Sequence, residues 1–207
     1  TLKVGGPGLC CSNDFLKNFL AYCRDHDVPL DFVSWHIYDG DASPYVVAQR
    51  AEHAQLGLDT YGFTDAENLL TEWNISVGSD YEHLWDATGA AWTVSALAYL
   101  QDTTVTIANR YRGDGGLGMF TSEGFYTKPA YGFLAFKRLL ETPQRLSASG
   151  SDADGYAVLA GRADDHLKTS EVSKTSEVWP LMVQVLISDY DSNHNGFDLT
   201  VTNLPWD

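Results

Sequence analysis

A chain of 207 residues, 44% of them hydrophobic, can bury a core as one domain or as a domain with a small appendage. Its formal net charge of −15 repels nucleic-acid phosphates and anionic membranes, so neither is an expected partner. No apolar run approaches the roughly 20 residues that span a bilayer. A soluble protein is therefore expected, and the first residues do not indicate whether it is cytoplasmic or secreted.

The first 140 residues alternate short apolar runs with stretches of helical periodicity. Ser12 is a suitable N-cap for the first helix, and proline stands near the start of two later helices. In chain order, we expect strands at residues 2–5, 31–38, 68–73 and 103–109, and helices after Ser12 and at residues 43–57, 84–100 and 129–140.

Four consecutive β/α units require a parallel sheet with helical crossovers, since parallel strands cannot be joined by tight turns. A doubly wound open sheet is one arrangement that satisfies this pattern. Half of a β/α barrel is another. The periodicity alone does not separate the two.

The pattern changes after residue 146, where glycine, serine and aspartate become frequent. Apolar runs at residues 156–160, 178–188 and 197–201 predict strands, and Asn195 with Gly196 is a strong hairpin signal between the last two. Residues 147–207 are therefore expected to form a small antiparallel β unit.

Glu72 is the most informative polar residue, because it stands at the end of an apolar strand. Reactive groups of parallel β/α proteins gather at the carboxyl ends of strands. His36 and Tyr38 end the preceding strand and are placed to hydrogen-bond this carboxylate. The structural alternative is a salt bridge between Glu72 and Arg110 or Arg112.

Four segments resemble glycoside hydrolase family 39, the β-xylosidase family whose (β/α)8 barrel carries two catalytic glutamates. Residues 4–7 resemble its fifth strand, residues 31–38 its sixth, residues 71–74 its seventh, and residues 128–136 the start of its last helix. The resemblance implies the C-terminal half of a TIM barrel, strands five to eight, at residues 1–146. An antiparallel β-sandwich segment would follow at residues 147–207.

The resemblance also implies roles for particular residues. Glu72 falls on the position of the catalytic nucleophile. The implied substrate-binding residues are His36 and Tyr38, which would orient the nucleophile, Gly6 and Pro7 in a loop near the substrate, Trp73 beside the nucleophile, and Glu123 after the eighth strand. No metal and no cofactor are implied.

The general acid/base of the family lies on strand four, to which no position here corresponds. The chain is thus expected to be a retaining glycosidase that lacks its acid/base strand, with β-xylosidase as the favoured activity and an oligosaccharide or aryl glycoside as the substrate. A non-catalytic sugar-binding or inactive barrel fragment is the alternative. The missing half would come from an N-terminal segment or from a second copy of the chain. No loop carboxylate is preferred as the acid among Asp39, Asp41, Asp80, Glu82, Asp114 and Glu123.

Overall fold

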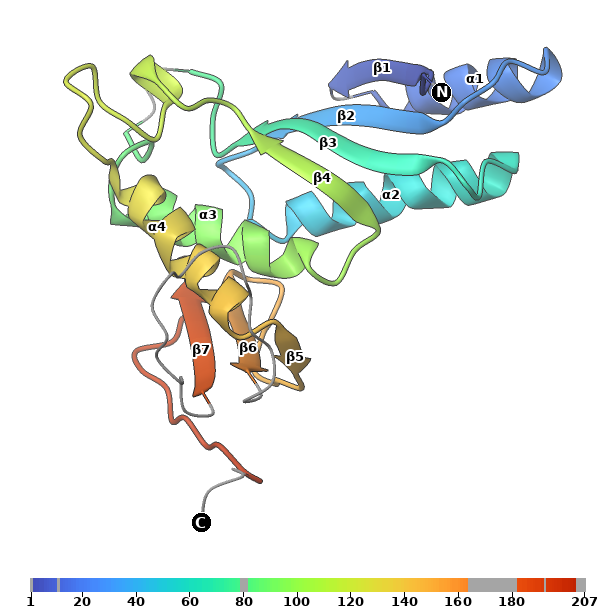
Figure 1. Cartoon of the computed structure of the whole chain (residues 1–207). Helices are drawn as coiled ribbons and strands as arrows, with labels where there is room; N and C mark the ends of the chain where they lie inside the picture. The colour runs from blue at the N-terminus through green and yellow to red at the C-terminus, as the bar shows by residue number, and fades with distance from the viewer. Residues whose placement is uncertain (1, 11, 79–81, 164–181, 192, 204–207) are drawn as a thin grey trace.

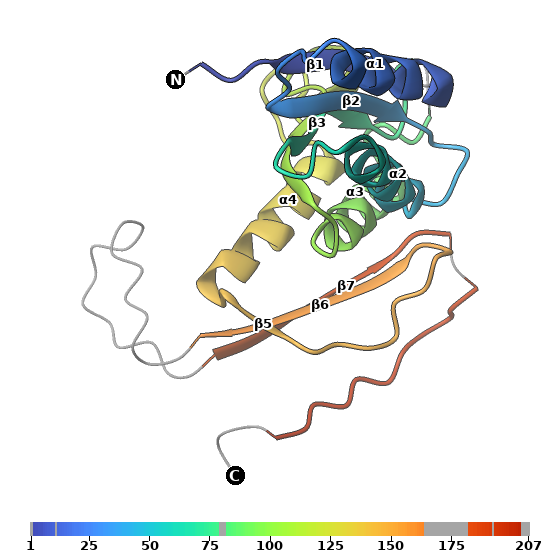
Figure 2. The same ribbon diagram turned by 90° about the vertical axis from the view of Figure 1, so that its right-hand side faces the viewer.

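The computed structural model describes residues 2–10, 12–78, 82–163, 182–191 and 193–203. It is an α/β structure with two sheets (Figures 1 and 2). The first sheet holds four parallel strands in the order β1-β2-β3-β4, and its strands are β1 (Gly5–Cys10), β2 (Phe32–Tyr38), β3 (Glu67–Asn74) and β4 (Val105–Arg110).

A helix follows each strand of this parallel sheet. The helices are α1 (Asn13–Asp25), α2 (Val46–Tyr61), α3 (Ala87–Leu100) and α4 (Lys128–Arg138), and short 3₁₀ turns stand at Gly115–Leu117 and Leu139–Glu141. Figure 1 shows the four strand arrows pointing the same way, so their carboxyl ends share one edge of the sheet. The expected alternation of strands and helices is confirmed.

The core lies between the sheet and the helices α2 and α3. Val33, Trp35 and Ile37 project from β2 to this side, as expected from the period of two along a strand. Asn68 is buried among them, and it accepts a hydrogen bond from Trp35 Nε1 at 2.7 Å and donates one to the Ala51 carbonyl at 2.9 Å. These bonds tie β2, β3 and α2 together without leaving the amide unsatisfied.

The largest departures from the predicted boundaries are in the first strand and the second helix. The first strand was expected at residues 2–5, but β1 begins at Gly5, because glycine and proline are depleted in strands and concealed its Gly-Gly-Pro-Gly sequence. The second helix was expected to end at Gly57, but it continues to Gly62, whose φ of +85° closes it. Gly57 faces α1 instead, where an added Cβ would lie 3.0 Å from Leu20 Cδ1.

The second sheet is antiparallel, in the order β5 (Gln144–Leu146), β6 (Tyr156–Ala163) and β7 (Met182–Asp189). Figure 2 shows it on the far side of α3 and α4 from the parallel sheet. Hydrogen bonds from Ser95 and Tyr99 on α3 to backbone carbonyls of Gly155 and Tyr156 attach it to the first layer.

The predicted hairpin at Asn195 and Gly196 is wrong. Residues 197–201 are described and form no strand, and Phe197 and Leu199 are more than half exposed. The strand β7 pairs with β6 instead, and β5, which the sequence did not predict, completes the sheet. The described residues thus contain one antiparallel sheet, whereas a sandwich requires two.

Within the described ranges, none of the helices has both the length and the apolar character needed to cross a bilayer.

Candidate active site

A bulge in β3 determines the direction in which Glu72 points. Trp35 of β2 pairs with Leu70, but the next residue, His36, pairs with Glu72, so Thr71 is an extra residue in β3. Leu70 faces the helices, and strict alternation would turn Glu72 toward them as well. The bulge reverses the alternation. The Trp73 side chain therefore packs on the helix side of the sheet, and the Glu72 side chain projects from the opposite face. We call this opposite side of the parallel sheet the open face.

Glu72 meets Tyr38 and His36 on the open face. The Tyr38 hydroxyl donates a hydrogen bond to Glu72 Oε2 at 2.6 Å, and His36 Nδ1 lies 3.6 Å from the same oxygen. The Glu72 side chain is 36% exposed and that of His36 is 21% exposed. Both neighbours approach Oε2, so among the described residues Oε1 has no hydrogen-bond partner and remains accessible from solution.

The phenol of Tyr38 is a permanent donor in this arrangement. Its partial burial, and then its hydrogen bond to Glu72, raise the pKa of Tyr38 well above its usual value of about 10. Tyr38 therefore remains protonated throughout the neutral range and holds one carboxylate oxygen in a fixed position.

The alternative ion pairs of Glu72 do not form. Arg110 projects to the helix side, where its Nη1 donates to Thr93 Oγ1 at 2.6 Å. Arg112 pairs with Asp114 at 3.3 Å in the loop after β4. Glu72 is consequently a carboxylate held by a phenol and an imidazole rather than one neutralised by a guanidinium.

The strand β1 places its glycines beside His36. Gly6 and Pro7 pair with Val33 and Ser34 of β2, and the register then shifts by one residue before Leu9. At Gly8, with φ of +69°, an added Cβ would lie 3.9 Å from His36 Nε2, so this residue packs directly against the imidazole. Gly6 and Pro7 thus border the site through β2, without a hydrogen bond to Glu72.

Asn74 ties the loop after β4 to the end of β3, a connection that sequence reasoning missed. Asn74 is fully buried and donates to the carbonyls of Tyr111 at 2.6 Å and Leu117 at 3.0 Å. The Tyr111 ring meets the Tyr38 ring edge to face, with centroids 6.3 Å apart. An aromatic side chain therefore stands next to the residue that holds Glu72.

Two expected substrate-binding residues lie away from this cluster. Trp73 is fully buried and packs against Trp92 and Phe133, so its indole offers no surface to a sugar. Glu123 is exposed in the loop after β4 and accepts a hydrogen bond from Ser122, which holds the pKa of its carboxyl below the usual value. We do not include either residue in the site.

Among the described residues, none of the candidate acids forms a hydrogen bond or ion pair with Glu72, Tyr38 or His36. Glu82 and Asp114 pair with His83 and Arg112, and no hydrogen bond or ion pair links Asp39 or Asp41 to the cluster. Asp80 lies outside the described residues. In the same ranges, no group of three or more His, Cys, Asp and Glu side chains is arranged to hold a metal ion.

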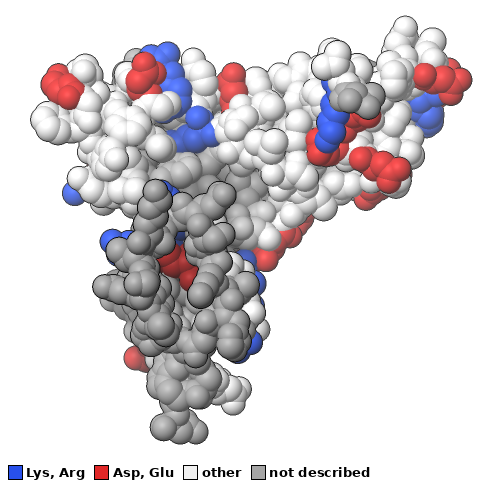
Figure 3. All heavy atoms as spheres, viewed as in Figure 1, with Lys and Arg blue, Asp and Glu red and all other residues white. Residues whose placement is uncertain are grey.

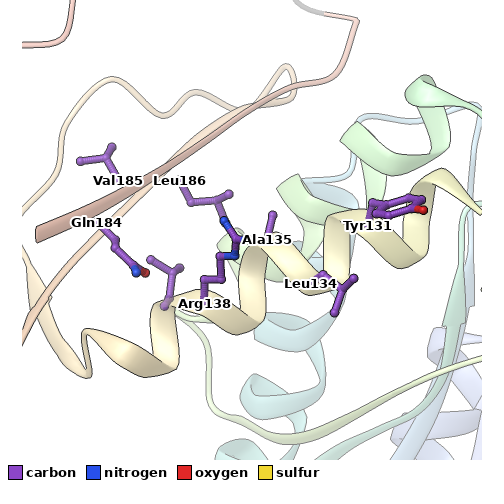
Figure 4. A pocket seen from close by; sticks show the side chains of 8 residues that line it. Tyr131, Leu134, Ala135, Arg138, Gln184, Val185 and Leu186 are labelled. Atoms are coloured by element: carbon purple, nitrogen blue, oxygen red, sulfur yellow. The ribbon is translucent and has the colours of Figure 1, made fainter. Parts of the chain in front are cut away.

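A separate cavity of about 630 Å³ lies between α4 and β7. It is lined by Tyr131, Leu134 and Arg138 of α4 and by Gln184 and Leu186 of β7, and Figure 4 shows Arg138 pointing toward Leu186. It shares no residue with the cluster around Glu72. On the face seen in Figure 3, acidic and basic side chains are scattered rather than gathered in one patch.

The parallel layer is similar in sequence to known proteins. The family model described as glycosyl hydrolases family 39 matches residues 1–112, more than half of the chain. A β-xylosidase from Geobacillus stearothermophilus is 45% identical over 42 residues, which are 20% of this chain and 8% of that protein.

Solved structures give longer matches. A glucosidase from Croceicoccus marinus is 33% identical with a TM-score of 0.67, over 79% of this chain and 37% of that one. A family 39 β-xylosidase from Caulobacter crescentus is 16% identical with a TM-score of 0.60, over 78% and 39% respectively, a likeness of fold alone. The chain thus spans well under half of the length of these relatives. It belongs to glycoside hydrolase family 39.

Proposed function

We propose that this chain is the C-terminal half of the catalytic barrel of a retaining glycoside hydrolase, with Glu72 as the nucleophile. The observation that carries the proposal is the position of Glu72, which lies at the carboxyl end of a parallel strand with Oε2 held by Tyr38 and Oε1 open to solution. In this proposal the partial barrel ends before β5, and the accessory β segment begins with β5 at Gln144, three residues before the expected boundary at residue 147.

The geometry supports a two-step displacement. Glu72 Oε1 attacks the anomeric carbon of a bound sugar, the glycosidic C–O bond breaks, and a glycosyl ester forms. Tyr38 holds the carboxylate in one orientation during the attack, so little reorganisation is needed. Water then attacks the same carbon, the ester bond to Glu72 breaks, and the carboxylate is regenerated.

The described residues contain no assigned general acid/base, which is the second carboxyl group of the reaction. Retaining chemistry requires an acid/base about 5–5.5 Å from the nucleophile. In the order β1-β2-β3-β4, the two outer strands each have one edge without a partner strand in the described residues. We propose that further strands pair with these edges to close a (β/α)8 barrel and bring the acid/base with them.

A β-linked xylose is the proposed sugar. The support is the local likeness to the Geobacillus stearothermophilus β-xylosidase, while the more extensive match to a glucosidase makes glucose the alternative. The two sugars differ in one hydroxymethyl group. Hydrolysis rates for matched aryl β-xylosides and β-glucosides would therefore decide between them.

The choice of leaving group makes the proposal testable on this chain alone. Dinitrophenolate leaves without protonation, whereas a phenolate or alkoxide needs the acid. We expect the folded chain to release dinitrophenol from dinitrophenyl β-xyloside and to leave the phenyl glycoside intact. Hydrolysis of both would mean that the chain contains its own acid. Sugar binding with no cleavage of either would favour a non-catalytic binding module.

Tyr38→Phe is expected to slow the attack by Glu72. A hydrogen bond to a charged group contributes about 1.5–3 kcal/mol, so its loss corresponds to a roughly 10- to 100-fold lower kcat/KM on dinitrophenyl β-xyloside. The matched control is Tyr131→Phe, since Tyr131 lies in the cavity between α4 and β7. Equal rates for Tyr38→Phe and the unmodified chain would remove Tyr38 from the mechanism.

A further inference from the structure

A group of buried donors on the helix side of the parallel sheet has no acceptor. Nε and Nη2 of Arg110, at the end of β4, are inaccessible to solvent and lack a hydrogen-bond partner, and so does Nε1 of Trp73 on the neighbouring strand. The two residues are paired in the sheet register, so their side chains lie next to each other on the same face. Buried donors of this kind are rare in folded proteins.

Two aromatic rings lie next to the guanidinium of Arg110. Its guanidinium carbon lies 5.6 Å from the centre of the Trp73 ring and 5.9 Å from that of Phe133. The one hydrogen bond of the side chain runs from Nη1 to Thr93 Oγ1, a neutral acceptor. Among the described residues, no carboxylate forms an ion pair with Arg110, so its charge is uncompensated.

Arg110 keeps this charge at neutral pH. Burial lowers the pKa of its guanidinium to about 10, which is still well above neutrality. An ordered water could satisfy the donors, but it would leave the positive charge of this half-buried side chain without a counter-charge.

We propose that Arg110 Nε and Nη2 together with Trp73 Nε1 form a site for a small monovalent anion, with chloride as the ligand. One negative charge matches one guanidinium, and a spherical ion needs only the N–H donors that are present. A phosphate or sulfate would carry more charge and more oxygen atoms than these three donors can satisfy. The site lies behind Glu72, on the opposite face of β3, and it does not depend on the proposed glycosidase activity.

The test is the thermal unfolding of the purified chain in chloride and in gluconate. Both series are kept at a constant ionic strength of about 0.15 M, where screening limits the repulsion from the acidic surface. We expect the Tm to rise by about 5 °C as chloride replaces gluconate, since a bound ion stabilises only the folded state. Arg110→Met should lose this rise. Arg138→Met, which removes an exposed arginine on α4, should keep it.

A milder variant covers the case in which Arg110→Met does not fold. Trp73→Phe removes one donor and keeps an aromatic ring, and we expect it to raise the chloride concentration at half-effect about 10-fold. Crystals of the unmodified chain grown in bromide should show an anomalous peak between Arg110 and Trp73. Equal Tm values in chloride and gluconate, with only a water molecule at that position, would overturn the proposal.

Discussion

Glu72→Gly should reduce the release of dinitrophenol from dinitrophenyl β-xyloside by at least about 10⁴-fold, the scale seen when a covalent nucleophile is removed. Added azide should then restore the release and give a xylosyl azide of inverted anomeric configuration. Azide is small enough to occupy the space left by the carboxylate, and it attacks from the side that Oε1 now faces. The measurement is the initial rate with and without azide, together with the stereochemistry of the product.

Glu67→Gln is the matched control for this experiment. Glu67 lies at the opposite end of the same strand, pairs with Lys3 at 2.6 Å, and has a side chain 34% exposed, close to the 36% of Glu72. It should retain the full rate and show no response to azide. A Glu72→Gly variant that keeps its activity, or an azide product of unchanged configuration, would contradict the proposed role of Glu72.

Trp92→Ala should lower the free energy of unfolding by about 3–5 kcal/mol, a large part of the roughly 5–15 kcal/mol typical of a folded protein. Trp92 is fully buried in α3, its ring centre lies 6.2 Å from that of Trp73, and its Nε1 donates to the Ala42 carbonyl at 3.3 Å. Truncation would leave a cavity where the sheet, α3 and the loop after β2 meet. Urea unfolding followed by far-UV circular dichroism gives the change.

Trp85→Ala distinguishes the loss of packing from the loss of a tryptophan as such. Trp85 is 47% exposed just before α3, and its truncation should cost less than about 1 kcal/mol. Similar losses of stability for the two variants would mean that the core is not organised around Trp92.

Local sequence patterns predicted the parallel layer well where hydrophobic periodicity was strong. The strand β2 and the helix α3 lie close to where their apolar runs indicated, because the side chains of both elements that pack into the core are apolar. The strand β1 was displaced because its glycines and proline carry no such signal. The absence of a strand at residues 197–201 could not be read locally, since strand formation depends on a partner strand elsewhere in the chain.

The site was predictable only in part, for a similar reason. The positions of Glu72, His36 and Tyr38 at strand ends suggested that they would meet, and they do. The extra residue Thr71, which turns Glu72 to the open face, depends on the pairing of two strands. The bond from Asn74 to the Tyr111 carbonyl depends on how a distant loop folds back. Neither the bulge nor this hydrogen bond can be recognised from a short stretch of sequence.

Trapping the glycosyl ester tests the central claim most directly. A fluorinated xyloside with a dinitrophenolate leaving group should glycosylate the nucleophile quickly, with release of dinitrophenolate, and the resulting glycosyl ester should hydrolyse slowly. The adduct then accumulates and can be located by peptide mass spectrometry. The proposed role of Glu72 predicts one fluoroxylosyl group per chain, on the peptide that contains Glu72, and none in Glu72→Gln. An adduct on another carboxylate, or labelling that persists in Glu72→Gln, would contradict it.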